Sequence, residues 1–254
     1  MVDITRDEYL EALERAGLTG HPGGIAGTRA LIGRLGIRPG ERVLDLGCGT
    51  GYTSCLMARE HRADVVAADL RPGMLAWARR RAEKERVTDA IRLVAADAHH
   101  LPFREWSFDA AVVESVLVFC DVPVALAELY RVLKPGGRLG CNELTVVGAE
   151  AREKMRRFTA SFAIAPAVTT EDEWTAAFRA AGFTGVAADV RPIDWLDVSL
   201  LSPLRTDGLR KYLSVLLQSV TDPEFRKISR GKRAFLASGL LRHIRSGLYW
   251  ASRP

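Results

Sequence analysis

The stretch that decides the fold is Val43-Leu44-Asp45-Leu46-Gly47-Cys48-Gly49-Thr50-Gly51. Its first four residues are apolar apart from one acid, which is typical of a buried parallel strand. Three glycines at alternate positions follow, and residues 52–59 continue with a helical pattern. A strand, a glycine turn and a helix N-terminus form a cradle for a nucleotide-like ligand. The missing side chains let the ligand approach the backbone, and free N–H groups point towards it.

The spacing of the glycines distinguishes between two kinds of nucleotide-binding loop. A dinucleotide fingerprint, G-x-G-x-x-G, would place its third glycine at position 52, where this chain has Tyr52. The glycines instead stand at 47, 49 and 51, and Asp45 lies two residues before the first. The motif is therefore D-x-G-x-G-x-G, and the rest of the chain has to decide which ligand it binds.

Strands and helices are predicted to alternate along the chain. The predicted strands cover residues 43–46, 63–69, 91–97, 108–114 and 138–143. The predicted helices between them cover residues 52–59, 74–85 and 124–133. Later segments predict a helix over 171–183, a strand that ends near Val190 and a closing edge strand over 247–253. This order predicts an α/β fold with a doubly wound, mainly parallel sheet that binds ligands beyond the carboxyl ends of its strands.

The composition is that of an ordinary soluble globular protein. Of 254 residues, 48% are hydrophobic and 26% charged. No run of about 18 apolar residues occurs, which argues against a membrane span. The first eight residues are polar and acidic, unlike a signal peptide. The four cysteines lack CxxC spacing, so reduced buried thiols are expected rather than disulfides, and the protein is predicted to be cytoplasmic.

The positive charge is concentrated at the C-terminal end. The chain carries a net charge of +5, and residues 205–254 hold eleven Lys or Arg against three Asp or Glu. A basic segment of this kind could contact nucleic acid, an anionic membrane or an acidic substrate, although a solvated helix face is the commoner explanation.

Four segments agree in order and spacing with one protein family. They are the glycine motif, the acid Asp69, the pair Asp97-Ala98 followed by Leu101-Pro102-Phe103, and Leu133-Lys134-Pro135-Gly136-Gly137-Arg138-Leu139. Together they resemble the class I S-adenosylmethionine-dependent methyltransferases, and above all the small-molecule branch that includes quinone, sterol and tocopherol methyltransferases. The resemblance implies a Rossmann-like sheet of seven strands with the last strand antiparallel. It also implies S-adenosyl-L-methionine as the cofactor.

The resemblance assigns roles to the residues that match the family's motifs. Asp45 and Gly47 to Gly51 would line the methionine and ribose portion, and Asp69 would bind the ribose hydroxyls. A carboxylate suits a vicinal diol because it accepts two hydrogen bonds. Asp97 and the backbone N–H of Ala98 would bind the adenine, which Leu70 and Met74 would sandwich. The full predicted cofactor-binding set is Asp45, Gly47, Cys48, Gly49, Thr50, Gly51, Asp69, Leu70, Met74, Asp97, Ala98 and Glu114.

Three residues are candidates for catalysis. Glu114 ends the fourth strand, and Val113-Glu114-Ser115 partly matches a methionine-glutamate-serine segment of the sterol and tocopherol branch. Glu114 could take a proton, or pair with the cofactor's amino group or a cationic intermediate. Glu143, next to Asn142, ends the fifth strand, and His21 lies in a glycine-rich arm before the core. No metal is predicted, because the pair His99-His100 lacks further ligands.

The chain is predicted to divide into four parts. They are an N-terminal helical arm (1–24), a methyltransferase core (25–192), a helical lid insertion (193–242) and a closing edge strand of the core (243–254). Leucines recur at helical spacing in the insertion and predict a face that packs onto the ligand edge of the sheet. They are Leu200, Leu201, Leu204, Leu213, Leu216 and Leu217. Such a lid would shape the acceptor pocket and exclude water.

Three functions are compatible with these features. A methyltransferase that acts on a small-molecule acceptor leads. An RNA methyltransferase that uses the basic C-terminal region is the second, and salt-sensitive RNA binding would favour it. A cofactor-binding protein without catalysis is the third. The sequence does not select among O, N, S or C as the methylated atom, and it leaves a homodimer open.

Overall fold

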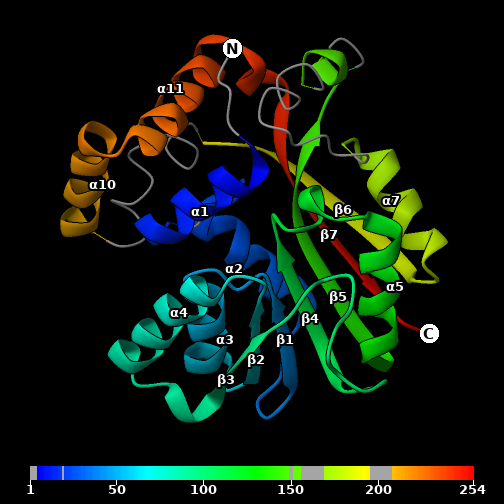
Figure 1. The fold of residues 1–254 in the computed structure, drawn as a ribbon. Coiled ribbons are helices and arrows are strands. Elements are labelled where there is room, and N and C mark those ends of the chain that lie inside the picture. The colour runs from blue at the N-terminus through cyan, green and yellow to red at the C-terminus, as the bar shows by residue number, and fades with distance from the viewer. Residues whose placement is uncertain (1–4, 19, 149–150, 156–168, 195–207) are drawn as a thin grey trace.

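Seven strands form one sheet in the order β3-β2-β1-β4-β5-β7-β6 (Figure 1). The computed structural model describes residues 5–18, 20–148, 151–155, 169–194 and 208–254. The strands are β1 (Arg42–Leu46), β2 (Asp64–Asp69), β3 (Ile91–Ala95), β4 (Phe108–Glu114), β5 (Leu133–Val146), β6 (Thr184–Pro192) and β7 (Ile244–Ser252). Strands β1 to β5 pair in parallel, and β7 runs antiparallel to β5 and β6. The predicted doubly wound sheet with an antiparallel last strand is confirmed.

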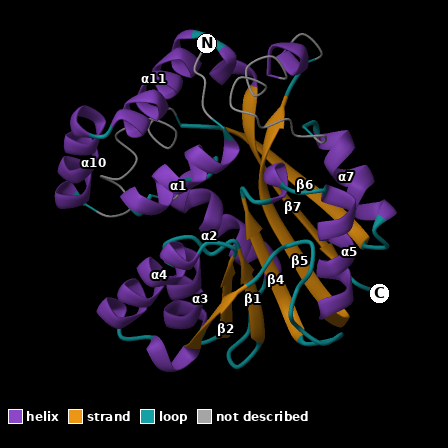
Figure 2. Cartoon of the chain, viewed as in Figure 1, coloured by secondary structure: helices purple, strands orange, loops and turns teal. Residues whose placement is uncertain are grey.

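Helices cover both faces of the sheet (Figure 2). They are α1 (Arg6–Ala16), α2 (Gly24–Leu35), α3 (Tyr52–His61), α4 (Pro72–Glu85), α5 (Val122–Val132), α7 (Glu171–Ala180), α10 (Leu209–Thr221) and α11 (Pro223–Ala237). Helices α2 and α3 pack on one face and α5 and α7 on the other. Because both faces are covered, the central strands are apolar almost throughout, and Val112 and Val113 of β4 are both fully buried. Among the described residues, no helix is long and apolar enough to cross a membrane.

Strand β7 does not lie at the edge of the sheet, so the prediction of a closing edge strand is wrong on that point. It pairs with β5 on one side and β6 on the other. The neighbouring residues Leu248 and Tyr249 are both fully buried, as expected of an interior strand. The edge strand is β6, on which Arg191 and Asp189 form an exposed ion pair. Charged side chains of this kind protect a sheet edge from pairing with other chains.

Within the segment predicted as a lid, helices α10 and α11 pack on α1, whereas Leu240 is buried with Val146 of β5 and Ile244 of β7. Val215 of α10 and Phe225 and Ile228 of α11 are buried against Ala12 and Ala16 of α1. The predicted leucine face is turned to solvent instead, because Leu213, Leu216 and Leu217 are exposed. Leu200, Leu201 and Leu204 lie outside the described residues. The prediction that this leucine face packs onto the sheet is therefore wrong for the part of it that the structure describes.

Candidate active site

The glycine loop between β1 and α3 has the backbone geometry that its sequence predicts. Gly47, Gly49 and Gly51 have φ angles of 73°, 51° and 79°, in the left-handed region that glycine adopts without steric cost. The backbone N–H groups of Gly47 and Cys48 donate to the carbonyl of Ala68, 2.7 and 3.0 Å away, so the loop is fixed against the end of β2. A Cβ at position 47 would overlap the side chain of Val116. The loop thus brings its backbone close to the carboxyl ends of β1, β2 and β4.

Two buried acids flank this loop. The carboxylate of Asp69 accepts hydrogen bonds from the N–H of Gly49 and the N–H of Arg71, each 2.9 Å long. Burial raises the pKa of Asp69, although these two hydrogen bonds oppose the effect. Asp45 accepts a hydrogen bond from the hydroxyl of Ser54, and burial raises its pKa to about 7. Both acids are therefore held in fixed positions beside the glycine backbone.

Asp97 lies beyond β3 and is fixed by a histidine. Its Oδ1 accepts hydrogen bonds from the backbone N–H of His99 and from His99 Nδ1, 2.9 and 2.7 Å away. Nε2 of His99 accepts from the N–H of Asp121, the N-cap of α5, over 2.9 Å. The backbone hydrogen bond from His99 lowers the pKa of Asp97, so this carboxylate stays ionised. His99 thus positions Asp97.

The predicted adenine-contacting residues differ in their exposure. Leu70, directly after β2, is 62% exposed, whereas Met74 on α4 and Ala98 are buried. Leu70 follows Asp69 directly, and an exposed large apolar side chain is suited to cover a flat aromatic ring.

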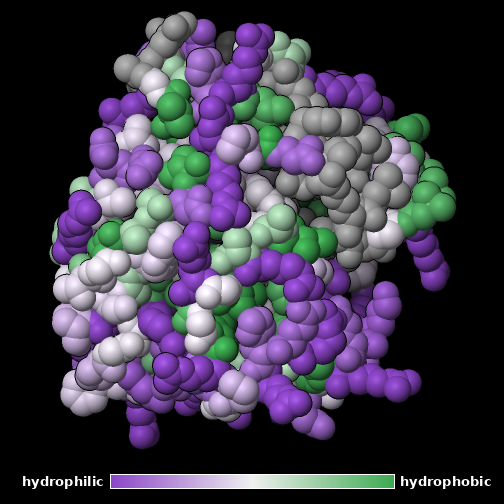
Figure 3. Space-filling view, turned by 180° about the vertical axis from the view of Figure 1, so that it is seen from behind, coloured by the Kyte–Doolittle hydropathy of each residue, from purple (hydrophilic) through white to green (hydrophobic). Residues whose placement is uncertain are grey.

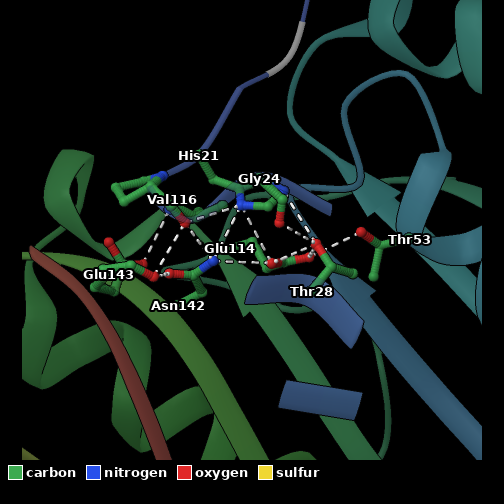
Figure 4. Close-up of polar contacts among 10 residues, drawn as sticks. His21, Gly24, Thr28, Thr53, Glu114, Val116, Asn142 and Glu143 are labelled. Carbon is green, nitrogen blue, oxygen red and sulfur yellow. Dashed lines mark hydrogen bonds and ion pairs between the residues drawn. The ribbon is translucent and has the colours of Figure 1, made fainter. Parts of the chain in front are cut away.

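The carboxylate of Glu114 is the centre of a polar cluster where the carboxyl end of β4 lies beside Asn142, which is within β5 (Figure 4). It accepts hydrogen bonds from Thr53 Oγ1 at 2.8 Å, Thr28 Oγ1 at 3.0 Å and Asn142 Nδ2 at 3.1 Å. Nδ1 of His21 lies 3.5 Å from its Oε2. The side chain of Glu114 is 7% exposed and that of His21 is 18% exposed. The structure therefore brings together two of the predicted catalytic residues, with His21 nearer to solvent.

Glu143, the third predicted catalytic residue, does not belong to this cluster. Neighbouring residues of a strand point to opposite faces, so Glu143 faces away from Asn142 and Glu114. Its Oε1 accepts hydrogen bonds from the backbone N–H groups of Val116 and Leu117, 3.1 and 2.9 Å away (Figure 4). Burial raises the pKa of Glu143 to about 8. Its described contacts thus hold the backbone that follows β4.

The residues present fit S-adenosylmethionine. The three left-handed glycines carry no side chains that would keep a ligand from the loop backbone, and Asp69 offers a fixed carboxylate for a diol beside this loop. Asp97 remains 45% exposed in its side chain and ionised, so it can accept a hydrogen bond from an adenine amino group.

Comparison with known proteins agrees with this geometry. A family described as "Methyltransferase domain" matches residues 44–141. An uncharacterised methyltransferase, YodH of Bacillus subtilis, is 31% identical over 224 residues, which are 82% of this chain and 92% of that protein. The chain belongs to the S-adenosylmethionine-dependent methyltransferases.

Two further proteins are similar to this methyltransferase. A demethylmenaquinone methyltransferase of Beutenbergia cavernae is 45% identical over 112 residues, 44% of each protein. The fold is also that of a Haemonchus contortus phosphoethanolamine N-methyltransferase solved with S-adenosylhomocysteine. That match has a TM-score of 0.75 and 20% identity, and it covers 98% of this chain and 58% of the other.

Several contacts of the methyltransferase site were not predicted from the sequence. Thr28 and Ser246 come from α2 and β7, far from every recognised motif. Thr28 Oγ1 lies 3.1 Å from His21 Nε2, and Ser246 Oγ donates to Asn142 Oδ1 over 2.9 Å. Hydroxyl residues inside helices and strands carry no sequence signal that would mark them as partners of an acid more than 80 positions away.

Helix α1 spans the carboxyl ends of the strands of this methyltransferase. Near one end, Glu14 accepts hydrogen bonds from Arg71 Nε and from the N–H of Gly73, both 2.6 Å long. Near the other end, Arg6 donates to the carbonyl of Phe119, which follows β4, over 3.3 Å. The N-terminal helix thus bridges the segments after β2 and β4, between which the glycine loop lies (Figure 1).

Proposed function

We propose that this methyltransferase binds its cofactor along the carboxyl ends of β1, β2 and β3 and methylates a small molecule held beside Glu114 and His21. In this proposal Asp69 binds the ribose hydroxyls and Asp97 binds the adenine amino group, with Leu70 over the ring. The Gly47–Gly51 loop would hold the methionine portion. The fixed hydrogen bonds of Asp69 and Asp97 support these assignments.

The bound cofactor supplies an electrophilic methyl group on a sulfonium. The protein then has to hold a nucleophile in line with that group, close to it and shielded from water. A hydroxyl acceptor must also lose its proton, for which a base is needed. The question for this site is therefore which residue can accept the proton of the methyl acceptor.

The observation that carries the proposal is that His21 has partners suited to both of its protonation states. In neutral His21, Nδ1 can accept a hydrogen bond from Asn142 Nδ2, which lies 3.0 Å away. In the protonated form, Nδ1–H faces two acceptors, Glu114 Oε2 at 3.5 Å and the carbonyl of Pro22 at 3.3 Å. The Glu114 carboxylate stabilises the positive charge of the imidazolium. In this proposal His21 accepts the proton of the methyl acceptor, and Glu114 keeps the imidazole in position.

The acceptor that fits this site is a small molecule with a weakly acidic hydroxyl. The demethylmenaquinone methyltransferase of Beutenbergia cavernae, by its name, acts on a quinone-type ring. The hydroxyl of such a ring system in its reduced form is weakly acidic and has to pass its proton to a base, the role proposed for His21. Glu143, which faces the other side of the sheet, has no step in this transfer.

The proposal is tested with methyl-labelled cofactor and fractionated small-molecule extracts, followed by steady-state kinetics on the acceptor that becomes labelled. His21→Ala should lower kcat by about a hundredfold or more and flatten the acidic limb of the pH–rate profile. His243→Ala, which removes an exposed histidine of the turn before β7, is the control and should leave both unchanged. An unaltered pH profile in His21→Ala would remove His21 from the mechanism. Cofactor binding without labelling of any fraction would favour a non-catalytic protein.

A further inference from the structure

Helix α10 carries a stripe of exposed aliphatic side chains on its surface. The stripe consists of Leu209, Leu213, Leu216, Leu217 and Val220, which are 38% to 71% exposed. Nine large hydrophobic residues are exposed in the described part of the chain, and five of them belong to this one helix of 13 residues. Their spacing places them on one side of the helix. Figure 3 shows a hydrophobic patch at the right-hand edge of the molecule, where α10 lies.

The stripe is not needed to hold α10 in place. The opposite side of the helix supplies Val215, which is buried with Phe225 and Ile228 of α11 against α1. Lys211 adds a second attachment, because its Nζ donates to the carbonyl of Ala16 and lies 4.2 Å from the centre of the Trp77 ring. A helix that is anchored by one face and exposes leucine on the other presents a binding surface.

The hairpin formed by α10 and α11 is strongly basic. Helix α10 contains no acid, and α11 contains one acid and five Lys or Arg. The two acids of the hairpin, Asp222 and Glu224, both contact Arg15 of α1, at 3.2 and 2.6 Å. Arg226, Arg230 and Arg233 are exposed. The hairpin thus combines an apolar stripe with a net positive charge.

We propose that the α10–α11 hairpin docks this protein on an anionic lipid surface. An amphipathic helix lies in the plane of such a surface with its apolar side chains among the acyl chains, while neighbouring Lys and Arg contact the anionic headgroups. A second copy of the chain is a less suitable partner for this positively charged hairpin. A symmetric contact between two stripes would bring two basic hairpins together, and like charges repel. An anionic membrane can bury the apolar stripe and also attract the positive charge of the hairpin.

Docking through the α10–α11 hairpin would place the membrane near the predicted active site. The hairpin packs on α1, and α1 bridges the segments that follow β2 and β4. A membrane on α10 would therefore lie on the same side of the molecule as the carboxyl ends of the strands. An acceptor that is dissolved in the lipid would then be close to the site.

The test is co-sedimentation of the full-length protein with vesicles of phosphatidylcholine, with and without phosphatidylglycerol. The wild-type protein should bind the anionic vesicles and lose affinity as salt is added. Leu213→Ser combined with Leu217→Ser, and separately Arg226→Glu combined with Arg230→Glu, should each weaken binding by about tenfold or more. Val124→Ser, at an exposed apolar position of α5, should bind as the wild type does. Cofactor affinity, measured on every variant, shows that the core is folded.

Three outcomes would overturn the proposal. The first is that wild-type protein fails to bind anionic vesicles while it still binds cofactor. The second is that the serine variant binds vesicles as well as the wild type. The third is a wild-type dimer in sedimentation velocity that becomes monomeric in the serine variant, which would identify the stripe as a self-association surface. None of these results depends on methyl transfer, so the proposed reaction is tested separately.

Discussion

Glu14 of α1 accepts a hydrogen bond of 2.6 Å from Arg71 Nε, and the backbone N–H of Arg71 donates to Asp69 over 2.9 Å. The N-terminal helix is thus joined through one residue to the acid at the end of β2. The second oxygen of Glu14 accepts from the N–H of Gly73 in the first turn of α4. Glu14 therefore holds α1 in position over the predicted cofactor site.

Glu14→Ala should release α1 from the core while the sheet remains folded. The substitution leaves the Gly73 N–H without this acceptor and removes the ion pair with Arg71, so docking of α1 should weaken by about 1–2 kcal/mol. Hydrogen exchange should accelerate in α1 and in the first turn of α4, and remain slow in β4 and β5. Glu11→Ala, which breaks an exposed pair with Arg15 on the same helix, is the control. Equal exchange in both variants would show that Glu14 does not hold the helix.

Asp69→Ala should weaken binding of S-adenosylmethionine by about 1.5–3 kcal/mol, because it removes charge-assisted hydrogen bonds to the ribose. Titration calorimetry measures the change. Asp64→Ala alters the opposite end of the same strand and should leave affinity unchanged. Unchanged affinity in Asp69→Ala would remove this acid from the cofactor site.

Gly49→Val should abolish cofactor binding and leave the protein folded. A β-branched residue at φ 51° costs about 1–2 kcal/mol, and in the proposed mode of binding its side chain would meet the cofactor. Gly136→Val is the matched control, because Gly136 has a φ of 75° and a Cβ there would meet no neighbour within 4 Å. The melting temperatures of both variants should fall by a similar amount, but only Gly49→Val should fail to bind the cofactor. Loss of binding in both would trace the effect to backbone strain alone.

Glu143→Gln should change how stability depends on pH. Burial raises the pKa of Glu143 from 4.5 to about 8, so the folded protein binds this proton more tightly than the unfolded chain does. The favourable contribution is full below about pH 4.5 and is lost as the pH rises towards 8. Over that interval the wild type should lose stability relative to the glutamine variant, by on the order of 3 kcal/mol.

Denaturant unfolding of both proteins at several pH values measures this difference. Glutamine keeps an oxygen for the N–H groups of Val116 and Leu117, so the contact itself is retained. A stability difference that stays constant from pH 5 to pH 8 would show that Glu143 is ionised in the folded protein, contrary to its raised pKa.

The amino-acid sequence alone determined the sheet and the predicted cofactor loop. Strand β1, the three glycines and α3 are adjacent in the chain, and their conformations follow from local rules: apolar runs for buried strands, and glycine where φ is positive. The acids Asp69 and Glu114 end their strands, so parallel topology brings them to one edge of the sheet. For these residues, position along the chain was sufficient to predict their place at the edge of the sheet.

Tertiary structure decided which surfaces are covered and which side chains meet. The pattern of α10 showed that it has an apolar face, but periodicity does not say what lies against that face, and the leucines proved to be exposed. Asn142 and Glu143 are neighbours in sequence, yet strand alternation places them on opposite faces, and only the pairing of β5 with β4 brings Asn142 to Glu114. Strand β7 lies inside the sheet because it pairs on both sides. Long-range pairing and packing depend on partners far away in the chain, and local sequence patterns carry no record of them.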